Sequence, residues 1–170
     1  MRTRRHNKPH PATSQAAGAG VESPAALVPF DNVLASIHAV SNQVDRAFYN
    51  EVEIKHDVSI AEWRIVMTLA ERPSATAAQI IELWGVEKMA VSRAVRRLES
   101  MGRVRRKVNA SDRRSYALVL TPAGRHLYEE MVPGARARYR EIVGALSREE
   151  IAVLRANLHK LLTHLRQLKP

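Results

Sequence analysis

The sequence predicts a mainly α-helical protein that carries one small β-hairpin. Three observations lead to this fold class. Apolar residues recur every three or four positions through most of residues 33–168, which is the period of an amphipathic helix. Capping boxes of the form Ser/Thr-x-x-Glu/Gln stand in front of three of these stretches. Between residues 103 and 121, two short segments rich in β-branched residues flank a polar turn, as the strands of a hairpin do.

The first predicted helix follows Pro29 and extends to residue 56, with one apolar stripe along its length. The stripe consists of Val33, Ile37, Val40, Val44 and Ala47 with Phe48. A second helix begins at the capping box of residues 59–62 and carries Trp63 on its inner face. It stops before Pro73, because the residue in front of a proline disfavours helical geometry.

A third helix begins at the capping box of residues 76–79 and ends at Gly85, and a fourth covers residues 87–101 and ends at Gly102. The fourth helix has an apolar inner face formed by Val91, Ala94, Val95 and Leu98. Its outer face is polar and basic and holds Met89, Ser92, Arg93, Arg96 and Ser100, with Arg97 beside them. Two short helices joined by a glycine-containing turn, the second one basic, form a helix-turn-helix.

A predicted hairpin follows this motif directly. Residues 103–108 and 116–121 are its strands, and residues 109–115 are the polar turn between them. A helix-turn-helix followed by a hairpin is the winged-helix arrangement. We therefore expect a winged helix-turn-helix domain over residues 59–121.

The rest of the chain is predicted to be helical. Thr121 followed by Pro122 is a strong helix start, and we expect this helix to kink or break at Pro133. The capping box of residues 147–150 opens a last helix with a leucine-rich stripe: Ile151, Leu154, Leu158, Leu161, Leu162, Leu165 and Leu168. Since a small winged-helix core does not need this stripe, we expect residues 30–56 and 122–168 to be dimerisation helices of a homodimer.

The positive charge of the chain is concentrated in one segment. Residues 84–114 hold ten Lys or Arg residues against three acidic ones, so 10 − 3 = +7 of the chain's net +10 lies there. A basic cluster of this kind is typical of a nucleic-acid-binding surface, and a merely solvated basic surface is the alternative.

Composition excludes several classes of site. The chain has no cysteine, which excludes disulfides, thiolate zinc sites and thiol redox sensing and fits a reducing compartment, so we expect a cytoplasmic protein. No run of 18 apolar residues is present, so we expect no membrane partner. Residues 1–28 are basic but lack the apolar segment of a signal peptide. We expect a disordered arm, either a free tail or a segment that touches DNA phosphates.

Residues 59–127 resemble the MarR-type transcriptional regulators in the order and spacing of their motifs. The most specific motif is the Asp-Arg-Arg wing segment at 112–114, which runs into Leu-Thr-Pro-Ala-Gly at 120–124. The run Leu-Glu-Ser-x-Gly at 98–102 is similar to the family's pattern as well. The flanking helices suit the family's dimerisation region, which extends the resemblance over residues 30–168.

The resemblance and the geometry of the motif together imply a set of DNA-binding residues on the recognition helix, at the N-cap of the preceding helix and in the wing. These are Thr76, Lys88, Met89, Ser92, Arg93, Arg96, Arg97, Asp112, Arg113 and Arg114. Each recognition-helix arginine can bind guanine or phosphate. In the wing, one arginine would enter or flank the minor groove while Asp112 pairs with the other. The family usually has Ser where this chain has Glu87, so the base preference should differ.

The resemblance also implies a pocket for a small aromatic or phenolic anion where the dimerisation helices meet the winged helix. The candidate effector-binding residues are His38, Asn42, Trp63 and Arg64. The alternative is that Trp63 is only a core residue and His38 only an interfacial one.

Enzymatic and metal chemistry are not expected. Asp112 has no second carboxylate, histidine or glycine-rich phosphate loop near it in sequence, and the seven histidines show no metal-ligand spacing, so no metal or cofactor is predicted. The sequence predicts a dimeric, sequence-specific transcriptional regulator, a repressor that a small ligand releases from a pseudo-palindromic operator in double-stranded DNA. The alternatives are a non-specific architectural DNA-binding protein without effector response, and an interaction scaffold that uses the leucine-rich ends without DNA.

Overall fold

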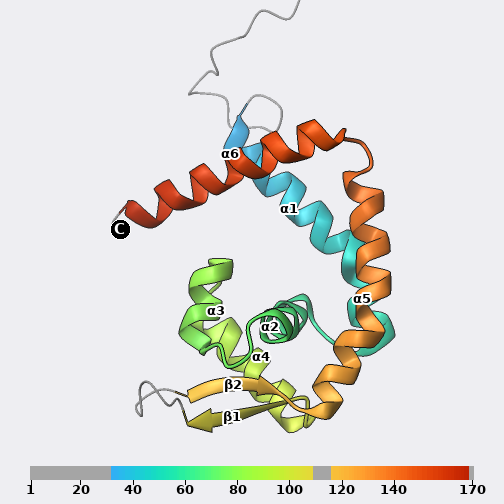
Figure 1. The fold of residues 1–170 in the computed structure, drawn as a ribbon, viewed down its shortest axis with the longest axis vertical. Helices are drawn as coiled ribbons and strands as arrows, with labels where there is room; N and C mark the ends of the chain where they lie inside the picture. Colours follow the sequence, from blue (N-terminus) through green and yellow to red (C-terminus); the bar gives the residue numbers. More distant parts are fainter. Residues whose placement is uncertain (1–31, 109–115, 169–170) are drawn as a thin grey trace, which may run out of the picture. The chain divides into compact units, whose positions relative to one another are not determined.

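The computed structural model describes residues 32–108 and 116–168 (Figure 1). Its elements in chain order are α1 (Val33–Tyr49), the π-helix η1 (Asn50–Ile54), α2 (Ile60–Glu71), α3 (Ala77–Trp84), α4 (Lys88–Ser100), β1 (Val104–Val108), β2 (Tyr116–Leu120), α5 (Pro122–Val143) and α6 (Arg148–Gln167). The predicted fold class, mainly α with one small hairpin, is confirmed. The chain divides into two compact units between Val40 and Ser41, and the helix-turn-helix belongs to the second unit.

The helices α2 and α3 begin at the capping boxes that the sequence predicts, and α3 ends at the predicted glycine. In front of α2, Ser59 N donates to Glu62 Oε2 at 2.8 Å and Glu62 N donates to Ser59 Oγ at 3.2 Å, which is the complete capping box. The same reciprocal bonds join Thr76 to Gln79 in front of α3. At the other end of α3, Gly85 adopts a left-handed conformation with φ of 62°, which glycine tolerates without steric cost.

The core lies between α2, α4 and the hairpin. The largest fully buried apolar side chains include Ile65 and Leu69 of α2, Ile80 of α3, Leu98 of α4 and Val104 of β1. The buried residues of α4 are the four that its helical period predicts, Val91, Ala94, Val95 and Leu98. Packing of this face against α2 leaves the opposite face of α4 to solvent.

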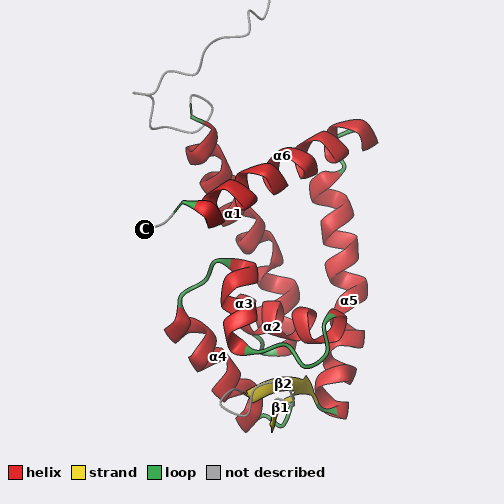
Figure 2. Ribbon diagram, turned by 60° about the vertical axis from the view of Figure 1, so that its left-hand side comes forward, coloured by secondary structure: helices red, strands yellow, loops and turns green. Residues whose placement is uncertain are grey.

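The strands β1 and β2, yellow in Figure 2, form an antiparallel hairpin. Val104 lies opposite Leu120, and Val108 lies opposite Tyr116. Leu118 N also donates to Ala75 O at 2.9 Å, which ties the hairpin to the start of α3. That bond was not predicted, because it joins segments more than forty residues apart in sequence. The tip, which carries Asp112, Arg113 and Arg114, lies outside the described residues.

The structure contradicts one form of the prediction for α5, a break at Pro133. The helix runs from Pro122 to Val143 without interruption. A proline removes one backbone donor from the helix, but Met131 is buried in the core and Val132 and Ala135 pack partly against it. Burial on both sides of the proline therefore keeps the helix continuous.

The last helix, α6, has its predicted capping box, in which Ser147 N donates to Glu150 Oε2 at 2.8 Å. None of its residues is buried in the single chain. The leucines of its stripe, among them Leu158, Leu161, Leu162 and Leu165, are 36–57% exposed. No helix within residues 32–108 and 116–168 is long and apolar enough to cross a membrane.

Candidate nucleic-acid interface and adjoining cavity

The outer face of α4 carries the exposed, cationic side chains that the sequence predicts. Met89 is 51% exposed, and Arg93 and Arg96 are exposed as well. Within the described ranges, neither of these two guanidinium groups has an ion pair or a hydrogen bond. Both are therefore available to a polyanion without breaking an existing contact.

Arg97 is placed differently from these two arginines. Its Nη2 donates to Asp57 Oδ1 at 2.7 Å, and its Nη1 donates to Glu62 Oε2 at 2.7 Å. The Glu62 side chain is only 3% exposed, whereas that of Asp57 is 79% exposed. The hydrogen bond with Asp57 and the negative charge of Glu62 raise the pKa of Arg97 above its ordinary value, so the guanidinium stays charged. Sequence reasoning missed both partners, because neither lies near Arg97 in the chain.

A groove of about 750 Å³ lies between the start of α3, α4 and the paired strands of the hairpin from Arg106 and Leu118 to Tyr116. It brings together three predicted DNA-binding residues, Thr76, Lys88 and Ser92. Two residues that were not predicted, Arg106 and Tyr116, complete its polar lining. The cations and hydroxyl groups that line this groove are suited to bind a sugar-phosphate backbone.

Arg106 and Tyr116 form a small unit at the base of the wing. Arg106 lies opposite Leu118 in the hairpin, so Tyr116 is its diagonal neighbour on the same face. The guanidinium lies 5.9 Å from the centre of the Tyr116 ring, and Arg106 Nε lies 2.9 Å from Glu99 Oε1. The alternation of side chains along β1 is the sequence signal that could have singled out Arg106 among its basic neighbours.

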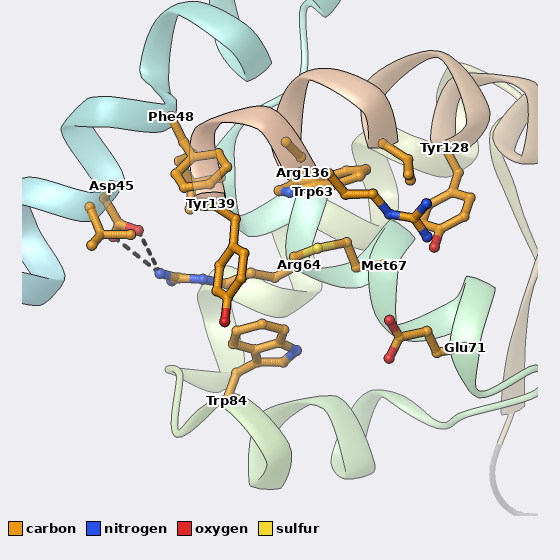
Figure 3. A pocket seen from close by; sticks show the side chains of 14 residues that line it. Asp45, Phe48, Trp63, Arg64, Met67, Glu71, Trp84, Tyr128, Arg136 and Tyr139 are labelled. Carbon is orange, nitrogen blue, oxygen red and sulfur yellow. Dashed lines mark hydrogen bonds and ion pairs between the residues drawn. The ribbon is translucent and has the colours of Figure 1, made fainter. Parts of the chain in front are cut away.

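A second hollow, of about 340 Å³, lies on the other side of α2 (Figure 3). Its lining comes from the end of α1, from α2, from the last residue of α3 and from α5. Aromatic side chains dominate this lining: Phe48, Trp63, Trp84, Tyr128 and Tyr139. Trp63 stacks on Tyr128 with ring centres 6.0 Å apart, so part of the wall is packed into the core. We call this hollow the aromatic cavity.

Four charged residues line the aromatic cavity: Asp45, Arg64, Glu71 and Arg136. Arg64 Nη2 donates to the two carboxylate oxygens of Asp45 at 2.8 and 3.1 Å, and its guanidinium lies 5.5 Å from the centre of the Trp84 ring. Arg136 and Glu71 also line the cavity, and neither has an ion pair within the described residues. The cavity thus combines flat apolar walls with two guanidinium groups.

A polar contact connects the cavity wall with the helix-turn-helix. Trp84, the last residue of α3, donates from Nε1 to Thr68 Oγ1 at 2.9 Å, and Thr68 Oγ1 donates to Arg64 O at 2.7 Å. Thr68 is 5% exposed, so both bonds are sheltered from water. Trp84 is therefore held in place by the same helix that carries Arg64.

The structure places two of the four predicted effector-binding residues in the aromatic cavity. Trp63 and Arg64 line the aromatic cavity. Asn42 is exposed and is not part of its lining, and His38 is exposed and belongs to the first unit. Among the described residues there is no group of three or more His, Asp or Glu side chains that could hold a metal ion.

Comparison with known proteins decides the family. A sequence model described as the MarR family matches residues 56–115. The HTH-type transcriptional regulator PecS of Dickeya dadantii is 32% identical over 136 residues, which cover 78% of this chain and 81% of PecS. The chain belongs to the MarR family of transcriptional regulators.

Solved structures of MarR-family proteins share the fold. A MarR/EmrR family regulator from Acinetobacter sp. ADP1 has a TM-score of 0.73 at 27% identity, covering 79% of this chain and 95% of that protein. A cysteine-to-serine variant of MarR from E. coli, crystallised with operator DNA, has a TM-score of 0.65 at 26% identity and covers 75% and 91%. This MarR-family protein is accordingly a DNA-binding transcriptional regulator and not an enzyme.

Proposed function

We propose that this MarR-family protein acts as a homodimeric, sequence-specific repressor, and that a small aromatic anion releases it from a pseudo-palindromic operator. The observation that carries the proposal is the outer face of α4. Arg93 and Arg96 are exposed there and have no hydrogen-bond or ion-pair partner among residues 32–108 and 116–168, on a helix whose opposite face is buried. A helix held in this way can enter the major groove with its cations directed at base edges and phosphates.

The proposed DNA-binding surface extends from α4 into the groove beside it. Lys88, Ser92 and Thr76 would bind one backbone strand, and Met89 would contact a thymine methyl group. Arg106 and Tyr116 add a cation and an aromatic ring at the base of the wing. In E. coli MarR, the related protein crystallised with operator DNA, the partner is a DNA duplex, which favours the same partner here. Asp112, Arg113 and Arg114 remain proposed wing contacts.

A homodimer is proposed from the leucine face of α6. Six apolar residues of the predicted stripe lie along this helix and the seventh, Leu168, is its C-cap; none of the helix residues is buried in the single chain. An exposed apolar stripe of that length is costly in water, and packing against the same stripe of a second copy would remove it from solvent. We therefore assign residues 59–121 to DNA binding and residues 30–56 and 122–168 to dimerisation.

The aromatic cavity is the proposed effector site. Its flat walls, Trp84 and Tyr139 among them, suit a planar ring, and Arg64 or Arg136 can pair with a carboxylate or phenolate. Glu71 can accept a hydrogen bond from a hydroxyl group on the ring. An aromatic hydroxy acid combines these features.

Selection of bound duplexes from a random DNA pool tests the DNA-binding part of this proposal. A specific dimer enriches a pseudo-palindrome with half-sites about one helical turn apart. Arg96→Ala should then flatten the sequence preference, while Arg72→Ala, at an exposed position outside the proposed contact residues and the dimerisation segments, should leave it intact. Enrichment of no sequence, with Arg96→Ala lowering affinity equally for all duplexes, would instead support non-specific architectural binding.

Intrinsic fluorescence tests the effector site, because both tryptophans of the chain, Trp63 and Trp84, line the cavity. Titration with 4-hydroxybenzoate should change the emission saturably and release the selected DNA, whereas cyclohexanecarboxylate should do neither. Arg64→Gln should weaken the response, and Arg72→Gln, whose side chain lies outside the cavity, should not. A flat titration with 4-hydroxybenzoate, benzoate and salicylate alike would contradict the assignment.

A further inference from the structure

Arg97 joins the recognition helix to the turn that leads into α2. Its guanidinium bridges two carboxylates on different segments, Asp57 in the turn and Glu62 in the first turn of α2. The turn itself is tight, since Asp57 has a φ of 52°, which a non-glycine residue adopts only where the surroundings hold it. Arg103, just after α4, adds longer contacts from its guanidinium to the carbonyl oxygens of His56 and Asp57, both at 3.4 Å.

The position of Arg97 on α4 also separates it from the other two arginines. With about 100° of rotation per residue, Arg93 and Arg96 each lie about 150° from the middle of the buried face, whereas Arg97 lies about 110° from it. Ser92 lies at a similar angle on the other flank, where it lines the groove next to the wing. Arg97 therefore faces α2 and the turn that leads into it, on the flank away from that groove.

The charges around Arg97 disfavour a DNA phosphate there. Two carboxylates already bind the Arg97 guanidinium, so a phosphate would have to compete with two existing ion pairs. Glu62 is almost fully buried, and its Oε2 accepts from both Arg97 Nη1 and Ser59 N. If Arg97 turned to DNA, this buried carboxylate would lose its only cation within the described residues.

We propose that Arg97 is a positioning residue that fixes the recognition helix against α2 through Glu62 and Asp57, and that it binds neither base nor phosphate. This inference rests on the proposed DNA-binding surface of α4. It divides the three arginines of that helix by role: Arg93 and Arg96 contact DNA, and Arg97 sets the angle at which they are presented.

The salt dependence of DNA binding distinguishes the two roles. Each phosphate contact that is removed should lower the slope of log Kd against log salt by about one. With the full-length protein and a duplex chosen by the random-pool selection, Arg97→Ala should leave this slope unchanged and reduce the preference over a scrambled duplex by roughly tenfold, the effect of one mismatched base pair. Arg93→Ala and Arg96→Ala are the matched variants, and each should lower the slope or abolish the preference at individual base pairs.

Glu62→Gln is the decisive variant. Glutamine can keep the capping box of α2 but cannot pair with Arg97 as an ion. Removal of a negative charge should tighten DNA binding if Arg97 contacts DNA, whereas loss of the clamp should weaken the sequence preference, roughly as Arg97→Ala does. Arg97→Lys, which keeps the charge but cannot bridge both carboxylates, should reduce the preference as well and serves if Arg97→Ala fails to fold.

Three results are informative. A slope lowered by about one in a folded Arg97→Ala variant, or tighter binding by Glu62→Gln, would overturn the positioning role. An unchanged slope with reduced preference in Arg97→Ala, Arg97→Lys and Glu62→Gln supports it. If Arg93→Ala and Arg96→Ala also leave slope and preference unchanged, the proposed DNA-binding surface itself is wrong, which is a separate result.

Discussion

Gly124, near the start of α5, is the position where the structure predicts the sharpest response to a small change. It is the third residue of the helix that Thr121 caps, and it is buried. A Cβ atom added there would overlap the carbonyl oxygen of Arg103 and stand 2.9 Å from its carbonyl carbon and 3.2 Å from Leu120 Cδ2. The Arg103 carbonyl is held in place because Thr121 N donates to it at 3.1 Å. The glycine of the Leu-Thr-Pro-Ala-Gly run is thus explained by a backbone that passes directly against it.

The expected change in the free energy of unfolding for Gly124→Ala is the sum of one stabilising and two destabilising effects. Alanine is favoured over glycine in a helix by about 1 kcal/mol. Forcing an extra methyl group into a packed site costs about 1–3 kcal/mol, and loss of the bond from Thr121 N to Arg103 O adds about 1 kcal/mol. The net destabilisation is about 1–3 kcal/mol, which lowers the Tm by about 2–4 °C for each kcal/mol in a chain of this size.

Thermal unfolding followed by circular dichroism measures this cost, and binding to the selected duplex reports on the wing. Because Arg103 directly precedes β1, a displaced carbonyl should move the hairpin, so DNA affinity should fall together with the Tm. Gly85→Ala is the control, since no atom lies within 4 Å of its added Cβ and only the left-handed backbone resists the change. A Gly124→Ala protein that melts at or above the temperature of the unmodified protein would refute the reasoning.

Three further outcomes are expected. Thr68→Val should lower the stability by about 1–3 kcal/mol in thermal unfolding, because it leaves the Trp84 Nε1 donor without its acceptor; equal stability would contradict the sheltered bond. Ser147→Ala should cost about 1 kcal/mol through loss of the α6 cap, whereas Ser100→Ala, at the exposed end of α4, should cost less. Leu158→Asp with Leu161→Asp should shift the protein from dimer to monomer in light scattering, and an unchanged mass would exclude α6 from the proposed interface.

The local features of the fold were predictable because their signals lie within a few residues of one another. Both members of each capping box stand three positions apart, and the glycine that ends α3 follows its last helical residue. The inner face of α4 follows from helical periodicity alone. The exposed cations of α4 could be named as DNA-binding candidates for the same reason.

The break at Pro133 that does not occur and the residues that sequence reasoning missed both depend on tertiary packing. Proline at position 133 disfavours a helix locally, but burial of Met131 in the core outweighs that preference. Arg106 and Tyr116 come together only when the two strands pair. Asp45 and Arg64 are nineteen residues apart in sequence, and no local pattern indicates that they form an ion pair beside Trp84.

Local sequence specifies which segments are helices and strands, where their caps lie, which face of α4 is apolar, and where the positive charge is concentrated. The first three depend on residue periods and on short-range hydrogen bonds. The packing of segments that are distant in sequence selects which arginines of α4 are bound by acidic side chains. A helical projection places Arg97 beside Arg93 and Arg96 but does not reveal its partners, because Asp57 and Glu62 approach the helix from a segment 35 to 40 residues away. Contacts between residues so far apart in sequence depend on how α2 packs against α4. The pattern of residues along α4 alone cannot predict that packing.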